Sequence, residues 1–198
     1  GTMLNKFSIE LTPEYMNLSF GAQKCSNPSA ELVAVLHALY EFRGSWGPND
    51  IVVVHADYLG VREWMTGNWK VKEPYIARIK GDIDKEIIKL TGKTTPNFLF
   101  IGLANSHPDY YFEVMDGIYA GMYSCKTDYL RYEDIKHKDI TINKIKNADI
   151  IYVGGGNTAK LMRLFRKYGI DKMLIEAYND DKVLCGVSAG GICWCDWG

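Results

Sequence analysis

The chain has 198 residues, of which 47% are hydrophobic and 24% are charged, and its formal net charge is −1. This composition is typical of a globular protein with a buried core, and the near-zero charge offers no field that would attract nucleic acid or an anionic membrane. No apolar run approaches the roughly 20 residues of a membrane-spanning helix, so we expect no membrane partner. The five cysteines follow neither a disulfide framework nor zinc-ligand spacing, which indicates reduced thiols and a cytoplasmic protein.

The first eighty residues predict a mixture of strands and helices. Residues 6–24 contain two short strand-like pieces around the turn signal Thr12-Pro13, and we expect them to form a hairpin over an open sheet edge. Residues 27–44 carry apolar side chains at helical spacing and end at a glycine, which predicts a helix. The further predicted elements are a buried strand over 51–56 and helices over 59–65 and 74–93.

From residue 97 onward, strand-like and helix-like segments alternate regularly. The predicted strands cover residues 97–104, 126–132, 149–155 and 182–189. The predicted helices cover residues 109–122, 141–148, 158–169 and 170–180. Such alternation predicts an α/β fold, a three-layer sandwich with a mostly parallel sheet covered on both faces. With the strand at 51–56 included, we expect one continuous mixed sheet around a shared core.

Two turns carry the candidate catalytic and binding residues, and each turn follows a predicted strand. In CGVSAGG, Ser188 stands between small residues that let the chain turn tightly, so its hydroxyl can project beside the next backbone N–H. In GGGNT, residues 154–158, glycines allow a ligand to approach the backbone at a helix start. Either turn alone is compatible with an ordinary strand-to-helix connection, and GGGNT alone also fits a phosphate site. Together they indicate one site at the carboxyl ends of the strands.

The segment ADIIYVGGGNTAKLMRLFRKYGIDKMLIEAYNDDKVLCGVSAGGICW resembles the dipeptidase E and cyanophycinase family of serine peptidases, and the resemblance extends over residues 82–198. It implies a fold like that of class I glutamine amidotransferases, with Ser188 as the nucleophile. It also implies an oxyanion site formed by Gly155, Gly156, Asn157 and the N–H of Ala189. The substrates would be small peptides cut beside acidic residues, and no cofactor is implied.

The region after Ser188 departs from this family. There a histidine and an acidic partner follow the serine by tens of residues, whereas here only AGGICWCDWG follows, with Asp196 as its single acidic residue. The four histidines all precede the serine, at His37, His55, His107 and His137. His107, just after a predicted strand, is the least implausible substitute base. A serine hydroxyl without a base is a weak nucleophile, so we expect little or no peptidase activity.

Residues 16–80 carry a second resemblance, through NPSAELVAVLHALYEF and DIVVVHADYLGVREWMTGNWKVKEPYIARIK, to the central part of ribonuclease H. In that family a helix glutamate and a strand-end aspartate help to bind two Mg²⁺ ions, and Glu31 and Asp57 match those positions. Two of the family's four carboxylates make a poor Mg²⁺ site. We therefore expect no bound metal, and the alternative is that both are ordinary polar positions at a helix start and a strand end.

The two resemblances lead to the hypothesis of a chimeric or engineered protein. A ribonuclease H-like fragment, residues 3–81, would join a dipeptidase E-like fragment, residues 82–198, in one merged domain whose sheet is extended by the first fragment's strands. Three functions stay open: a peptidase-like protein with an incomplete catalytic triad that binds small peptides, a noncatalytic scaffold able to dimerise through sheet edges, and a Mg²⁺-dependent nuclease remnant. Nucleic acid is not the expected partner.

Overall fold

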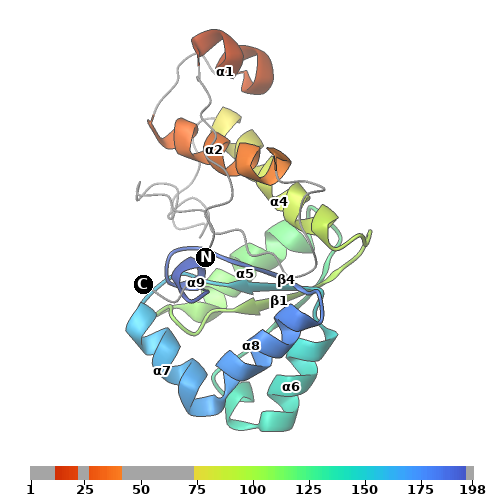
Figure 1. Ribbon diagram of the computed structural model, residues 1–198, viewed down its shortest axis with the longest axis vertical. Helices are drawn as coiled ribbons and strands as arrows, with labels where there is room; N and C mark the ends of the chain where they lie inside the picture. Colours follow the sequence, from red (N-terminus) through yellow and green to blue (C-terminus); the bar gives the residue numbers. More distant parts are fainter. Residues whose placement is uncertain (1–11, 22–26, 42–73, 195–198) are drawn as a thin grey trace.

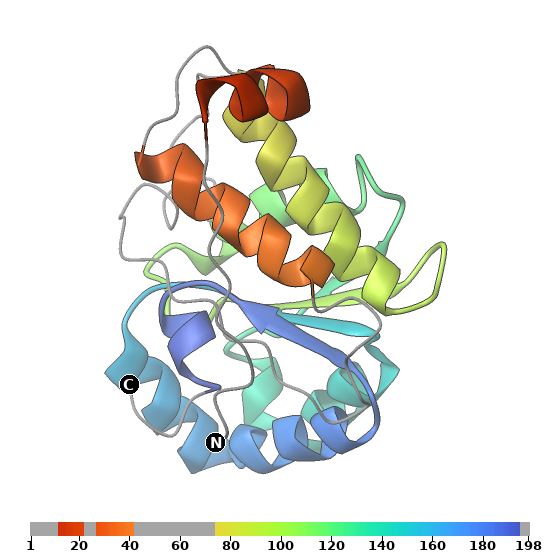
Figure 2. The ribbon, with the colours of Figure 1, turned by 45° about the horizontal axis from the view of Figure 1, so that its top comes forward.

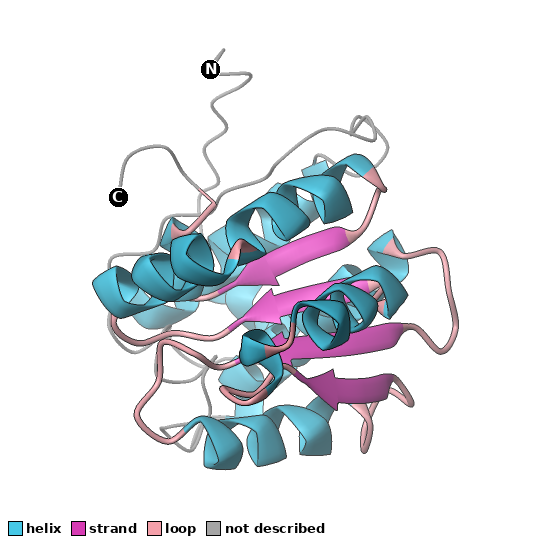
Figure 3. Ribbon diagram, turned by 90° about the horizontal axis from the view of Figure 1, so that it is seen from below, coloured by secondary structure: helices cyan, strands magenta, loops and turns pink. Residues whose placement is uncertain are grey.

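Four parallel strands form the centre of the protein in its computed structural model, which describes residues 12–21, 27–41 and 74–194. The strands are β1 (Asn97–Ile101), β2 (Lys126–Tyr129), β3 (Ile150–Val153) and β4 (Val183–Gly186). Their order in the sheet is β2-β1-β3-β4, and all four arrows point the same way in Figure 3. The predicted α/β class with a parallel sheet is confirmed. The three pairings among these strands are all parallel, and the strand at 51–56 that belongs to the expected mixed sheet lies outside the described residues.

Side chains of the central strands alternate between two cores because successive residues of a strand point to opposite faces. Phe98 and Phe100 of β1 belong to one core, and Leu99 and Ile101 belong to the other. All four residues of β3 are buried. The central strands of a parallel sheet that is covered on both faces are buried on both sides. Their sequences are therefore apolar throughout and do not alternate between apolar and polar residues.

One face of the sheet is covered by the helices that follow β2 (Figure 1). These are α6 (Lys138–Asn147), α7 (Thr158–Tyr168), α8 (Ile170–Asn179) and the short α9 (Ala189–Ile192), with a 3₁₀ turn, η1, at Asp134–Lys136. The predicted stop of α7 at Gly169 is confirmed, since this residue caps the helix with a φ of 70°.

The other face is covered by α5 (Pro108–Tyr119) and α4 (Pro74–Leu90), and above them lie α1 (Pro13–Phe20) and α2 (Asn27–Glu41). Figure 2 shows α1 and α2 stacked on α4, which both helices contact. The buried residues Met16, Leu32 and Ile79 belong to the same apolar core as Phe98 of the sheet. The first eighty residues thus contribute to the core on this face.

A buried polar group links α4 to α5 within this core. The Asp84 carboxylate accepts hydrogen bonds from Lys80 Nζ at 2.9 Å and from the Tyr119 hydroxyl at 3.0 Å. Burial and the neighbouring Asp84 raise the pKa of Tyr119 well above its ordinary value, so the phenol stays protonated and keeps donating.

The predicted hairpin over 6–24 is wrong for residues 13–20, which form α1. The side chain of Thr12 accepts a hydrogen bond from Tyr15 N at 3.1 Å, a proline occupies the first turn, and Gly21 ends the helix with a φ of 71°. Met16 and Phe20, four residues apart, face the core. Capping at both ends and this helical spacing outweigh the strand-like composition. The rest of the predicted hairpin lies outside the described residues.

The other predicted elements within the described ranges occur with ends shifted by at most three residues. The predicted strand 51–56 and helix 59–65 lie outside those ranges. No described helix combines the length and the apolar character needed to cross a bilayer.

Candidate active site

The turns after β3 and β4 lie side by side at one edge of the sheet. We call it the carboxyl edge, because the strands end there. Val153 of β3 pairs with Gly186 of β4, and Val187 N donates a hydrogen bond to Val153 O at 3.2 Å. A Cβ placed on Gly190 would lie 1.9 Å from Val153 O. The start of α9 therefore packs directly against the end of β3, and only glycine permits this contact.

Ser188, between β4 and α9, has a strained backbone. Its φ is 56° and its ψ is −120°, a conformation that L-residues rarely adopt and that costs about 1–3 kcal/mol. The strain matches the sharp strand-to-helix turn on which hydrolases present a serine. The half-buried Ser188 hydroxyl has no hydrogen-bond partner within residues 12–21, 27–41 and 74–194. Among the described residues, therefore, no hydrogen bond has to break before the Ser188 hydroxyl can react.

Cys185 is the other potential nucleophile on β4, three residues before Ser188. Burial of its sulfur raises the pKa of the Cys185 thiol far above its ordinary value. The thiol stays protonated at neutral pH, so it does not compete with Ser188 as a nucleophile.

The turns after β3 and β4 contain backbone N–H groups without acceptors among the described residues. Within the described ranges, no acceptor receives the amide N–H of Gly155, Gly156 or Ala189. Gly155 and Ala189 are buried, and buried amides are nearly always paired in folded proteins. Ala189 opens α9, where the first N–H groups lack an intrahelical partner. Such donors are suited to stabilising negative charge on an oxygen that forms next to Ser188.

The loop after β1, residues 102–107, forms the third side of the site. Gly156 has a φ of 146°, and a Cβ on it would lie 2.2 Å from Ala104 O. The neighbouring Asn157 N donates to Ala104 O at 3.0 Å. The β3–α7 turn is therefore fixed against the end of β1, and the site uses the ends of three neighbouring strands.

Gly155 and Gly156 follow the end of β3, and Ser188 and Ala189 follow the neighbouring end of β4, so the two motifs lie at the same edge of the sheet. Their joint role as nucleophile and oxyanion site stays a prediction. Asn157 has a different contact from the expected one. Its side-chain oxygen accepts a hydrogen bond from Lys160 N at 2.8 Å and caps α7. Its role at an oxyanion stays a prediction.

No histidine bonds to Ser188 among the residues that the structure describes. His107 is exposed at the start of α5, and its backbone N–H bonds to Asn105 Oδ1 at 2.8 Å. His37 contacts the Tyr15 hydroxyl between α1 and α2, and His137 precedes α6. His55 and Asp196 lie outside the described residues.

The two ribonuclease H-like carboxylates lie outside the part of the chain whose side chains are described. Glu31 lies on α2, and neither its side chain nor any part of Asp57 is among the described residues. Within the described part of the chain, no three histidine, cysteine, aspartate or glutamate side chains form a cluster that could hold a metal ion.

The sequence reading missed Lys160, which reaches the same edge. Its Nζ donates to Asn105 O at 3.3 Å, and it lies 5.1 Å from the centre of the Tyr132 ring. A signal was present, because a residue three positions after the cap Asn157 must lie on the first turn of α7.

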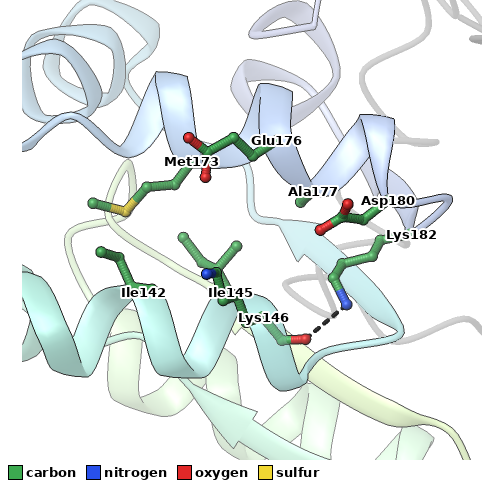
Figure 4. A pocket seen from close by; sticks show the side chains of 8 residues that line it. All are labelled: Ile142, Ile145, Lys146, Met173, Glu176, Ala177, Asp180 and Lys182. Carbon is green, nitrogen blue, oxygen red and sulfur yellow. Dashed lines mark hydrogen bonds between the residues drawn. The ribbon is translucent and has the colours of Figure 1, made fainter.

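A small groove of about 260 Å³ lies between α6 and α8 and is open to solvent (Figure 4). Lys182 beside it donates to Lys146 O and to Ala148 O, both at 2.7 Å. These residues precede β3 and β4, so the groove lies at the opposite edge of the sheet, the amino edge. It is not part of the site around Ser188.

The strained serine on a strand-to-helix turn of an α/β sheet resembles the turn on which hydrolases present a nucleophilic serine. The family model described as Peptidase family S51 matches residues 77–198. The chain belongs to this family.

Two curated proteins that are similar to this chain carry the name peptidase. The chain is 29% identical over 116 residues to the uncharacterized peptidase YgaJ of Bacillus subtilis (strain 168), which covers 59% of this chain and 50% of YgaJ. It is 33% identical over 107 residues to the uncharacterized peptidase Lin0382 of Listeria innocua, covering 52% and 48% of the two chains. A crystal structure of a candidate peptidase E from Listeria monocytogenes EGD-e aligns with a TM-score of 0.44 and 25% identity over 52% of this chain and 54% of that chain. The chain spans about half the length of the curated relatives it matches.

Proposed function

We propose that this chain carries the nucleophile part of a serine peptidase site, in which Ser188 attacks the carbonyl carbon of a small peptide. The observation that carries the proposal is the backbone of Ser188, whose φ of 56° is retained on a turn between close-packed glycines. Strain of this kind persists only where the surrounding structure enforces it, and it concentrates at functional sites.

The backbone N–H groups of Ala189, Gly155 and Gly156 would stabilise the oxyanion of the tetrahedral intermediate. This assignment is supported by their lack of acceptors in the described residues and by their position around the serine turn. Removing one such donor in a serine hydrolase typically costs about 100-fold or more in rate. Asn157 would act indirectly, because its cap fixes the start of α7.

The general base is the part of the reaction that the described residues do not supply. A serine hydroxyl is a weak nucleophile until a neighbouring base accepts its proton. We therefore propose that the described residues alone support slow turnover of peptides or none. Faster turnover would need a base from residues outside the described ranges or from a partner subunit.

The test is covalent labelling with a fluorophosphonate, followed by mass spectrometry of the modified peptide. The adduct is expected on Ser188 and should form slowly, over hours at a high probe concentration, because no described residue acts as the base; Ser188→Ala should lose it. Ser124, exposed before β2 at the amino edge and also at positive φ, offers a matched control, since Ser124→Ala should label like the wild type. An unmodified Ser188, or equal labelling of the Ser188→Ala variant, contradicts the proposal.

The origin of the first part of the chain stays a proposal of its own, in which residues 3–81 and 82–198 have different ancestry. The family match begins at residue 77, close to the proposed seam. A merged domain is supported by the apolar core that includes Met16 and Phe98. Limited proteolysis that released two stable fragments near residue 81 would contradict it. The ribonuclease H likeness, the homodimer, the scaffold function and the cytoplasmic location stay predictions.

A further inference from the structure

Lys160 is held in a fixed position at the carboxyl edge by two contacts. Its Nζ donates to the backbone oxygen of Asn105 at 3.3 Å, and the ammonium lies 5.1 Å from the centre of the Tyr132 ring. The Tyr132 hydroxyl donates to Leu103 O at 2.9 Å, which orients the ring. A cation over an aromatic face is attracted to it, so the ammonium is preorganised and need not be ordered by a ligand.

This ammonium has no carboxylate partner among the residues that the structure describes. Lys80, Lys93 and Lys144 each form an ion pair with an aspartate, whereas Lys160 forms none. A lysine ammonium has three N–H donors, and one is used by Asn105 O. Lys160 is also half-buried, so its charge is less screened than that of a lysine on the open surface. Two donors are left for a negatively charged ligand.

The strand order gives an estimate of the lateral separation between the contact of Lys160 and the serine turn. Lys160 contacts the loop after β1, whereas Ser188 follows β4, and β3 lies between these strands. Two strand spacings amount to roughly 10 Å. Gly156 and Asn157, which lie between the two positions, are exposed. An extended peptide advances about 3.3 Å per residue, so it would cover this span with about three residues.

We propose that Lys160 is a specificity residue that binds a carboxylate of the peptide about three residues from the bond attacked by Ser188. The inference rests on the proposed function of Ser188. The carboxylate can belong to the C-terminus or to an acidic side chain, since both present the same anion to the ammonium. A charge-assisted hydrogen bond of this kind strengthens binding about tenfold or more.

The test is peptide binding followed by NMR titration of the full chain carrying Ser188→Ala, which removes turnover. The probes are N-acetyl-tetra-alanine as the free acid, the same peptide as its amide, and an amide whose last alanine is replaced by aspartate. The free acid should bind about tenfold more tightly than the alanine amide. Binding of the aspartate amide like the free acid identifies a side-chain carboxylate as sufficient, whereas binding like the alanine amide restricts the site to the C-terminus.

Matched variants assign this preference to Lys160. Lys160→Gln should abolish it, Lys160→Arg should retain most of it, and Lys172→Gln, which removes the charge of an exposed lysine on α8, should leave it intact. The melting temperature of each variant is measured as well. Weaker binding with an unchanged melting temperature indicates a lost ligand contact, whereas a lowered melting temperature indicates that the hydrogen bond to Asn105 O also stabilised the fold. The inference is overturned if the Ser188→Ala protein with its native Lys160 binds the free acid and the alanine amide equally, or if it binds neither peptide.

The two proposals fail in different experiments. Labelling of Ser188 together with equal acid and amide binding would reject the carboxylate subsite and leave the nucleophile assignment standing. A Lys160-dependent acid preference in a protein whose wild-type Ser188 is never labelled would reject the nucleophile and retain the carboxylate site.

Discussion

The two edges of the parallel sheet differ in how their backbone groups are paired. At the amino edge, side chains close the strand starts. The Asp149 carboxylate accepts hydrogen bonds from Lys93 Nζ at 2.7 Å and from Asn97 N at 2.9 Å, and Lys182 bonds to two backbone oxygens. At the carboxyl edge, the turns of Gly155 and Ser188 contain amides that lack acceptors in the described ranges.

This difference separates a part that stabilises the fold from a part suited to chemistry. Both edges belong to the same strands, so the strand architecture alone does not distinguish them. Positive φ at non-glycine residues occurs at both edges, at Ser124 before β2, at Asp181 before β4 and at Ser188 after β4. The carboxyl edge adds backbone contacts that exclude a Cβ at Gly190. Features of this kind lower stability, and proteins commonly retain them where binding or catalysis requires them.

The largest effect should come from filling the contact between α9 and β3. In Gly190→Ala the new Cβ would lie 1.9 Å from Val153 O, and the backbone would have to move. We expect a loss of about 3 kcal/mol in the free energy of unfolding, measured with urea. Gly117→Ala on α5, where a Cβ meets no atom within 4 Å, should instead stabilise by about 1 kcal/mol. Equal changes in the free energy of unfolding for Gly190→Ala and Gly117→Ala would mean that α9 does not pack this closely against the end of β3.

A smaller effect should follow from releasing the strain at Ser188. Glycine tolerates positive φ and alanine does not, so Ser188→Gly should be about 1–2 kcal/mol more stable than Ser188→Ala. The same pair at Ser106, which lacks a positive φ, should show glycine equal to or less stable than alanine. If Ser188→Ala were more stable than Ser188→Gly, the positive φ assigned to residue 188 would be contradicted.

The smallest expected effect concerns Asp149 at the amino edge. Burial alone would raise the pKa of Asp149, but the hydrogen bonds from Lys93 and from Asn97 N outweigh it and lower the pKa below its ordinary value. Asp149→Asn removes the charge and should cost about 1 kcal/mol at neutral pH.

The sign of the pH dependence follows from this lowered pKa. The unfolded carboxyl takes up its proton near pH 4, and the folded one does so at a lower pH. The wild type should therefore be more stable than Asp149→Asn above about pH 4, and this advantage should decline as the pH falls through the folded pKa. A difference in melting temperature that stayed constant between about pH 2 and pH 6 would contradict the role of the charge.

Most of the described strands, helices and turns could be predicted because their signals lie in short, continuous segments of the sequence. Buried runs such as 149–155, helical spacing over 158–169 and the two glycine turns lie in continuous sequence. Residues 13–20 were misread, although their capping signals, Thr12 and Gly21, are also local. The contact of Lys160 with Asn105, 55 residues away, depends on strand order and on a side-chain conformation. No local pattern predicts either of these.

The most direct test of the central claim is a crystal structure of the chain with a phosphonate adduct on Ser188. The account predicts that the phosphoryl oxygen lies about 2.7–3.1 Å from the backbone N of Ala189 and of Gly155 or Gly156. A phosphoryl oxygen that points into solvent, with these amides unbonded, would contradict it.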